Sequence, residues 1–222
     1  MQEEIYKYRL KLTKTGALRF ISHLDWQSLI LKIFRRCEIN LVLSEGFNKM
    51  PKVSYSPALP IFLESECEFV NFQTFDVLPD NFKEIFKKNS PEGLNIVNLK
   101  FQNENEPKSL ENYCQWARYS AKIKKTIYNF SEIRYIVDNC LSSDEILIEK
   151  KTKKGILKKV NYRNSLKTIE IQDDNFLSFI LKVGQSDCIP ALRADEFLKL
   201  LFKDTDFSIK RLEFFDSDMR VI

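Results

Sequence analysis

The feature that most restricts how this chain can fold is a change in the period of its hydrophobic residues, which occurs twice in the same order. Over residues 5–12 apolar and polar residues alternate, and this period of two is typical of a strand with one buried face. After Ser22 and Asp25, which have the spacing of a capping box, the period becomes helical. The helical stripe consists of Trp26, Leu29, Ile30, Ile33, Phe34 and Cys37. The patterns that follow predict two strands, a helix and a strand, at residues 53–56, 66–75, 79–88 and 94–101.

The same order begins again after a polar stretch, Gln102 to Glu111, which we expect to be a linker. The second half is predicted to hold strands at 113–127, 145–150, 166–171, 176–183 and 207–214, with helices at 130–140 and 190–202. We therefore predict an α+β protein of two tandem ferredoxin-like βαββαβ units, residues 1–104 and 111–222, with an extra basic β-hairpin in the second unit. A single α+β domain with one continuous sheet is the alternative.

Composition narrows the class of protein. Of the 222 residues 44% are hydrophobic, and only 5 are Gly and 7 are Pro, which favours a compact globular chain. We find no signal-peptide pattern after Met1 and no apolar stretch near the roughly 18 residues needed to cross a bilayer. We therefore expect a cytoplasmic protein without a membrane partner.

The chemistry-bearing residues give little support for catalysis. The five cysteines are dispersed singly, without the C-x-x-C spacing of a zinc or redox site or the cluster that an iron-sulfur centre needs. No phosphate-cradling loop, Ser/His/Asp set or paired catalytic carboxylates stand at a recognisable spacing. We expect no cofactor and no metal, and a protein that is not an enzyme.

Several strings in the first half are distinctive. They are Gly16 to Asp25 with Arg35-Arg36 on the same helix, Ser44 to Asn48, Pro51 to Ser54, Leu59-Pro60 and Glu64 to Glu66. Together they resemble the radical-SAM-linked domain family, a bacterial domain of unknown function found fused to, or encoded beside, radical-SAM proteins. The resemblance implies a radical-SAM partner on another chain. The turn Asn48-Lys49-Met50-Pro51 departs from the Asn-Pro-His-Pro-like turn of the family, so a second histidine is missing.

Two segments of this region are candidates for binding RNA or a partner. His23, the only histidine, and Asp25 lie at the predicted start of the first helix, where a neutral imidazole could act or where both residues simply belong to the helix cap. Arg35 and Arg36 lie near its C-terminal end, where cations also complement the helix dipole. A loop that could contact a phosphate or a stacked base, or merely connect elements, contributes Ser44, Gly46, Phe47, Asn48 and Lys52.

The second half has one strongly basic segment. Between 150 and 163 it carries no acidic residue, and Gly155 suits a hairpin turn. Its cations are Lys150, Lys151, Lys153, Lys154, Lys158, Lys159 and Arg163. Such a hairpin could follow a phosphate backbone, or it could be a solvated edge that prevents aggregation.

These features lead to a leading hypothesis and two alternatives. We expect a non-catalytic accessory protein that binds structured RNA, with tRNA and rRNA as candidates, or a radical-SAM partner enzyme that modifies RNA. The alternative from the enzyme class is a metal-independent endoribonuclease of the CRISPR repeat-processing type, which also pairs two ferredoxin-like folds. The other alternative is a protein-only scaffold for the radical-SAM partner.

Overall fold

The structure is a computed structural model that describes residues 4–102, 109–151, 155, 157–173, 175–184 and 188–222. Contacts divide the chain into two compact units, Met1–Tyr113 and Cys114–Ile222. Of the predicted hairpin cations, Lys153 and Lys154 lie outside the described residues.

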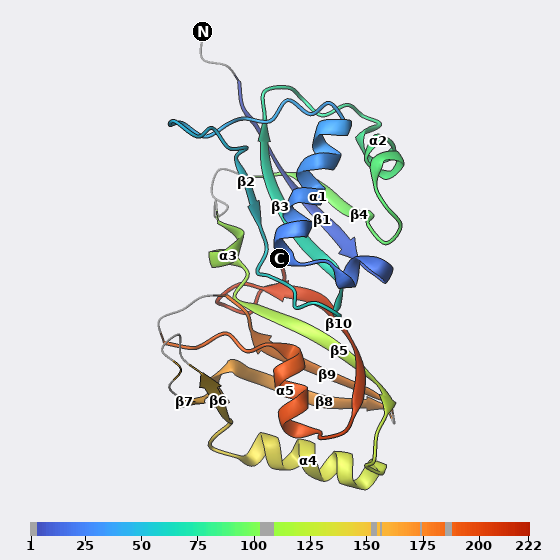
Figure 1. Ribbon diagram of the computed structural model, residues 1–222, viewed down its shortest axis with the longest axis vertical. Coiled ribbons are helices and arrows are strands. Elements are labelled where there is room, and N and C mark those ends of the chain that lie inside the picture. Colours follow the sequence, from blue (N-terminus) through green and yellow to red (C-terminus); the bar gives the residue numbers. More distant parts are fainter. Residues whose placement is uncertain (1–3, 103–108, 152–154, 156, 174, 185–187) are drawn as a thin grey trace. The chain divides into compact units, whose positions relative to one another are not determined.

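The first unit is an antiparallel sheet with helices (Figure 1). Its strands stand in the order β4-β1-β3-β2, and all neighbouring pairs are antiparallel. Along the chain the elements are β1 (Tyr6–Lys14), the 3-10 helix η1 (Gly16–Phe20), α1 (His23–Arg36), β2 (Val53–Tyr55), β3 (Glu64–Thr74), α2 (Phe82–Asn89), β4 (Ile96–Phe101) and α3 (Leu110–Tyr113).

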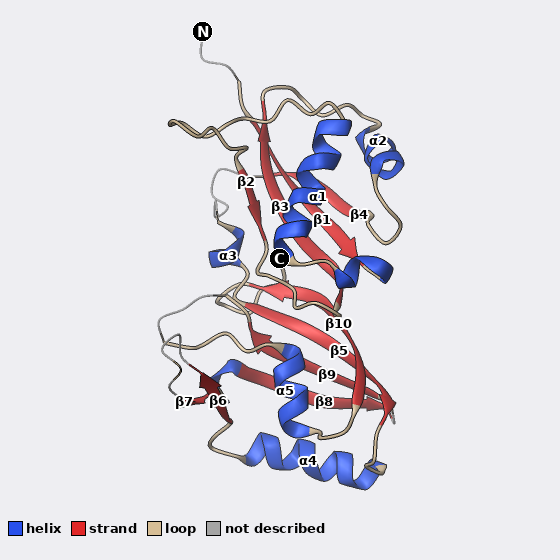
Figure 2. Ribbon diagram, in the orientation of Figure 1, coloured by secondary structure: helices blue, strands red, loops and turns tan. Residues whose placement is uncertain are grey.

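Helices α1 and α2 cover one face of this sheet (Figure 2). The predicted stripe of α1 is buried in the core, where the Phe34 ring lies 4.6 Å from that of Phe72 on β3. On the facing strands Leu10 lies opposite Val70 on one side and Leu99 on the other, so one apolar row crosses the sheet under the helices. Burial of such side chains stabilises a fold by about 1.5–3 kcal/mol each.

Within the second unit the strands stand in the order β10-β5-β9-β8, with all neighbouring pairs antiparallel, and β6 and β7 form a separate two-stranded hairpin. Its elements are β5 (Trp116–Lys125), α4 (Phe130–Ser142), β6 (Leu147–Lys151), β7 (Leu157–Asn161), the 3-10 helix η2 (Arg163–Ser165), β8 (Leu166–Asp173), β9 (Phe176–Lys182), α5 (Ala194–Leu201) and β10 (Asp206–Phe215).

Aromatic side chains fill the core of the second unit. Tyr119 stacks on Phe179 at 5.6 Å between ring centres, and Phe179 also contacts Phe197 of α5 at 5.5 Å. Helix α4 begins at a full capping box, because Asn129 accepts from the backbone N–H of Glu132 while the Glu132 carboxylate accepts from that of Asn129.

The prediction of a mixed α+β protein is confirmed, with differences at particular elements. The helix expected over 190–202 begins only at Ala194, because the preceding residues make hydrogen bonds to other elements: the Leu192 N–H donates to the Lys182 carbonyl of β9, and Ser165 Oγ of η2 donates to the Pro190 carbonyl. Contacts place the division of the chain after Tyr113, whereas the sequence began the second half at residue 111. The difference is helix α3, whose buried Leu110 donates its N–H to Ser54 Oγ.

No helix within the described ranges is both long and apolar enough to cross a membrane.

Candidate functional site

The long strand β3 gives the first unit two distinct ends. At its start, which we call the Glu64 end, Arg19 Nη1 lies 3.7 Å from Glu64 Oε1, so η1 and the beginning of α1 lie there. At its finish, the Thr74 end, the Phe75 N–H donates to the Asn40 carbonyl just after α1. Helix α1 therefore runs from one end to the other, and the two ends are roughly 30 Å apart by the rise of an extended strand.

His23 and Asp25 lie at the Glu64 end. Both stand in the first turn of α1, as the sequence predicted. Ser22 Oγ accepts from the Asp25 N–H at 3.1 Å and donates to Asp25 Oδ2 at 2.6 Å, so the aspartate takes part in the helix cap. His23 Nε2 lies 2.9 Å from Gln27 Nε2, and its ring packs edge-on against Tyr55 at 6.3 Å. Burial raises the pKa of Tyr55, which leaves its hydroxyl protonated to donate to the Gln27 carbonyl.

Arg35 and Arg36 lie at the opposite end of α1 from His23, in its last turn, and both are exposed. A helix rises 1.5 Å per residue, so roughly 20 Å of helix separates the arginines from the histidine. The structure thus divides the predicted residues of α1 between the two ends of the unit.

The predicted loop lies at the Thr74 end, because the Val42 N–H donates to the Gln73 carbonyl on β3. We call residues 44–50 the Phe47 loop. Its base is closed by hydrogen bonds from the Ser44 N–H to the Met50 carbonyl at 2.7 Å and from the Met50 N–H to Ser44 Oγ at 3.0 Å. The Phe47 side chain at the tip has an exposed fraction of 104%. The other predicted loop residues, Gly46, Asn48 and Lys52, are exposed as well.

The Thr74 end therefore gathers four exposed cations and an exposed ring on one end of the unit: Arg35, Arg36, Lys49, Lys52 and Phe47. Cations attract phosphate groups, and a flat ring can stack on a base. Of the predicted residues, Arg35, Arg36, Phe47 and Lys52 are the ones that the fold brings to one place, and Lys49 joins them there.

The basic hairpin of the second unit is less uniform than its sequence. Lys150 lies opposite Lys158, and Glu149 lies opposite Lys159, so successive pairs face opposite sides of the ribbon. Lys150 Nζ lies 3.0 Å from Glu196 Oε2 and 5.1 Å from the centre of the Tyr162 ring. Burial opposes the charge of Lys150, but hydrogen bonds to Glu196 and Tyr162 outweigh it and raise the pKa. Lys159 is 3.9 Å from Glu149, and Lys151 lies at the end of β6.

Arg163, the last predicted cation of this segment, binds the end of α4. Its Nε donates to the Ser143 carbonyl at 2.8 Å and its Nη2 to the Leu141 carbonyl at 3.1 Å. Carbonyls at a helix C-terminus have no partner within the helix, so the guanidinium completes their hydrogen bonding.

Replacing Arg163 with glutamine is expected to lower the free energy of unfolding by about 1 kcal/mol, since two charge-assisted hydrogen bonds are lost at a partly exposed site. Urea unfolding followed by circular dichroism measures it. Lys158→Gln, at an exposed position of the same segment, is the control and should leave stability within about 0.5 kcal/mol. Equal stability of the two variants would show that the Arg163 contacts contribute nothing to α4.

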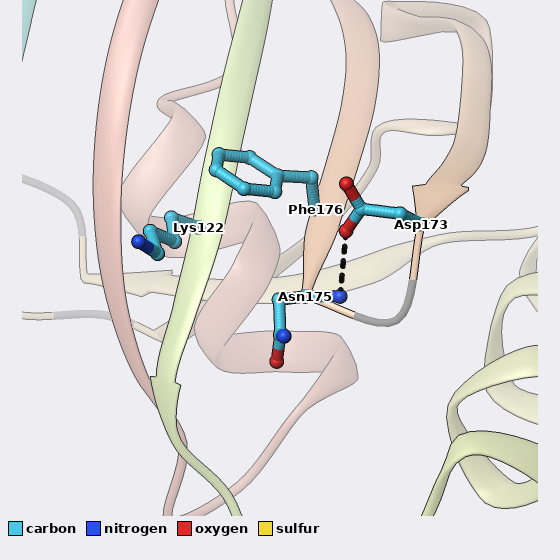
Figure 3. Close-up of a pocket in the computed structure, with 4 residues that line it drawn as sticks. All are labelled: Lys122, Asp173, Asn175 and Phe176. Atoms are coloured by element: carbon cyan, nitrogen blue, oxygen red, sulfur yellow. Dashed lines mark hydrogen bonds between the residues drawn. The ribbon is translucent and has the colours of Figure 1, made fainter.

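A pocket of about 410 Å³ lies beside the turn between β8 and β9 in the second unit (Figure 3). Asp173 Oδ1 accepts from the Asn175 N–H at 2.8 Å, and Lys122 Nζ lies 5.5 Å from the centre of the Phe176 ring. The charged groups of this pocket thus have partners in its own wall. In the described part of the chain no three His, Cys, Asp or Glu side chains gather as metal ligands.

The sequence did not single out two exposed rings at the Glu64 end, Phe20 and Phe62, which contact each other. Phe20 lies within the segment Gly16 to Asp25, which carries the family resemblance, and Phe62 lies between two other such segments, but neither ring lies on a helical stripe or in an alternating strand pattern. The one signal in the sequence for the exposed Phe62 ring was a phenylalanine within a turn segment after Pro60.

The fold and these surfaces define a class: a mixed α+β protein with mostly antiparallel sheets that displays aromatic and cationic side chains at the end of one unit. The chain belongs to a family described as an uncharacterized protein conserved in bacteria (DUF2344), whose sequence model matches residues 7–190.

No curated protein matches the chain. Among solved structures 24 chains match, including one from the crystal structure of a Cbf5-Nop10-Gar1 complex. That match has a TM-score of 0.42 and 9% sequence identity, and it covers 93% of this chain but 48% of the solved one. This chain thus spans about half the length of that relative.

Proposed function

We propose that this protein is a non-catalytic module that binds structured RNA, with the Thr74 end of its first unit as the contact surface. The observation that carries the proposal is the Phe47 ring, fully exposed at the tip of a loop closed by hydrogen bonds. Leu43 and Met50, on either side of the hydrogen-bonded base of this loop, are exposed as well, and exposed apolar side chains gathered in one place mark interaction sites. Four exposed cations at the same end, against three exposed carboxylates there (Glu38, Glu45 and Asp76), supply a small net attraction for phosphate.

We further infer that each unit is a ferredoxin-like βαββαβ fold. The strand orders β4-β1-β3-β2 and β10-β5-β9-β8 support this, because in each unit the last, first, third and second strands of the pattern then stand side by side. The β6–β7 hairpin is then an insertion between the first helix and second strand of the second unit. Antiparallel sheets of this kind leave one face open for other contacts.

The distinctive sequence segments of the first unit also support a protein partner for this chain. Because they resemble the radical-SAM-linked domain family, we propose that the protein presents its RNA, with tRNA and rRNA as candidates, to a radical-SAM modifying enzyme on another chain in the cytoplasm. The exposed hairpin cations, Lys158 and Lys159, then add phosphate contacts outside the first unit.

The test is RNA binding by Phe47→Ala. Base-to-ring stacking is worth about 1–3 kcal/mol, so we expect the affinity for RNA to fall about tenfold. Fluorescence anisotropy of a labelled tRNA mixture, titrated with purified protein, measures it. Because Phe47 contributes nothing to a core, the melting temperature should not change.

The matched control is Phe130→Ala, which removes a partly exposed ring from α4 of the second unit. It should leave RNA affinity unchanged. If Phe47→Ala and Phe130→Ala bind RNA equally well, the Phe47 loop is not the contact. If the wild-type protein binds no RNA but retains a radical-SAM enzyme in a defined two-protein mixture, the scaffold alternative replaces the proposal.

A further inference from the structure

A second aromatic surface lies at the Glu64 end of the first unit. The rings of Phe20 and Phe62 are 5.8 Å apart and meet at 80°, edge to face. Both are open to solvent, with exposed fractions of 53% for Phe20 and 71% for Phe62. The Arg19 guanidinium carbon lies 4.7 Å from the centre of the Phe20 ring. Two rings and a guanidinium group are thus joined in one small patch, which we call the Phe62 platform.

The platform is held firmly by its surroundings. The Phe62 N–H donates to the Arg19 carbonyl at 2.7 Å, which ties the turn before β3 to η1. Arg19 Nη1 is 3.7 Å from Glu64 Oε1, and the same carboxylate oxygen accepts from the Gly16 N–H at 3.0 Å. Glu64 therefore orients the arginine, while the backbone fixes the position of the Phe62 ring.

Phe62 has an unusual backbone conformation for a side chain of its size. Its φ is 76°, in the left-handed region, where a bulky residue is disfavoured by about 1–2 kcal/mol. Glycine or asparagine would fit the turn with less strain. Packing of the ring against the turn does not explain this backbone conformation, because most of the Phe62 ring is exposed to solvent. Strain of this kind is concentrated at functional positions.

We propose that the Phe62 platform binds one unpaired base of the RNA, which stacks on the open face of Phe62 beside Arg19. This rests on the proposed function and deepens it, because it requires the RNA to carry a loop, bulge or end in addition to its helical part. Aromatic rings and arginine planes are the groups on which splayed-out bases stack. A base within a duplex has both faces covered by its neighbours, so a blunt duplex does not offer this contact.

The composition of the patch favours a base over a protein surface. The contacts of the patch join two rings, one guanidinium group and the Glu64 carboxylate, whereas a stable protein interface buries about 800 Å² on each partner and is built on many side chains. The flat groups present match a single flat ligand. The chain's net charge of +4 is compatible with a polyanionic ligand.

The test uses Phe62→Gly together with Phe62→Trp in the full chain. Glycine removes the ring and relieves the strained φ, so the melting temperature should stay the same or rise while RNA affinity falls about tenfold. The probes are an RNA hairpin with a single-stranded loop and a blunt duplex of the same stem. The loss should appear with the hairpin and not with the duplex.

Phe62→Trp reports on stacking directly. Trp26 and Trp116 are buried at 1% and 4% exposure, so the wild-type protein gives the fluorescence baseline. We expect the new indole to be quenched by the hairpin and not by the duplex. Phe130→Ala is again the control, because Arg134 lies 5.4 Å from the centre of its ring, in a similar pair on α4.

The outcomes separate the two proposals. If the wild-type protein binds the hairpin tightly while Phe62→Gly binds equally well and the indole is not quenched, the platform proposal is overturned and the RNA-binding function stands. If the wild-type protein binds neither probe, the proposed function fails and the platform proposal fails with it. If Phe62→Gly loses stability in parallel with affinity, the ring is a staple of the turn.

Discussion

Replacing Gly93 with alanine is expected to destabilise the protein by about 3 kcal/mol or more, among the largest effects of a single methyl group in this chain. Gly93 has a φ of 87°, and a Cβ built on it would lie 2.2 Å from the backbone oxygen of Thr15 and 3.0 Å from its carbonyl carbon. The Gly93 carbonyl also accepts from the Thr15 N–H at 3.1 Å and from Thr13 Oγ1 at 2.9 Å. The backbone therefore cannot move away without breaking these hydrogen bonds.

Gly16→Ala is the matched control for this prediction. Gly16 also has a positive φ, of 61°, but nothing lies within 4 Å of its Cβ position. The free energy of unfolding of Gly16→Ala should fall only by the conformational cost of a side chain at positive φ, about 1–2 kcal/mol. Urea unfolding of both variants measures the difference. Equal losses would mean that the close approach between Gly93 and Thr15 has no energetic consequence.

Removing both exposed aromatic sites, in the double variant Phe47→Ala/Phe62→Gly, is expected to weaken binding of a looped RNA about a hundredfold. The two rings lie at opposite ends of β3, roughly 30 Å apart along an extended strand, so their contributions should add. The single variants should each lose about tenfold. Anisotropy titrations of the wild type, both single variants and the double variant complete the cycle.

The cycle also shows whether one RNA molecule contacts both sites. Additive losses indicate that it does. If the double variant binds as well as the weaker single variant, the two rings do not engage the same RNA at once. A melting temperature that does not fall in the double variant is the required control, because neither ring belongs to the buried core.

The period of the hydrophobic residues predicted the helices and strands of this protein well where a helix or strand buries one of its faces. The stripe from Trp26 to Phe34 is buried under α1 as expected, and the strand pattern of residues 66–75 is β3, since Val70 and Phe72 lie in the core. Short elements were missed for a physical reason. Helix α3 has only four residues, which is less than two turns, so it has no period for the sequence to reveal.

The candidate site was harder to predict than the fold. The sequence named Phe47 and the arginines of α1, but only the chain path shows that they share the Thr74 end while His23 lies at the other. Charge density in sequence was also an incomplete guide to surface charge. Lys150 and Arg163 are held by Glu196 and by the carbonyls of α4, which are distant in sequence.

The Phe62 platform, which the sequence did not predict, is a second example of a surface that residue patterns do not reveal. Phe62 is noteworthy because of its positive φ and its open ring, and neither property can be read from a pattern of residue types. A turn containing a phenylalanine is ordinary in sequence. Its contact with Phe20, 42 positions earlier, depends on the packing of η1 against the start of β3.

RNA binding by the wild-type protein, followed as salt is raised from about 50 mM to 200 mM, tests the central claim most directly. Each phosphate contact on single-stranded RNA lowers the slope of log affinity against log salt by about 0.7. If the four cations of the Thr74 end and the hairpin cations Lys158 and Lys159 all reach phosphates, the predicted slope is about −4. Failure to bind a tRNA mixture at the lowest salt, or an affinity that does not change with salt, would contradict the account.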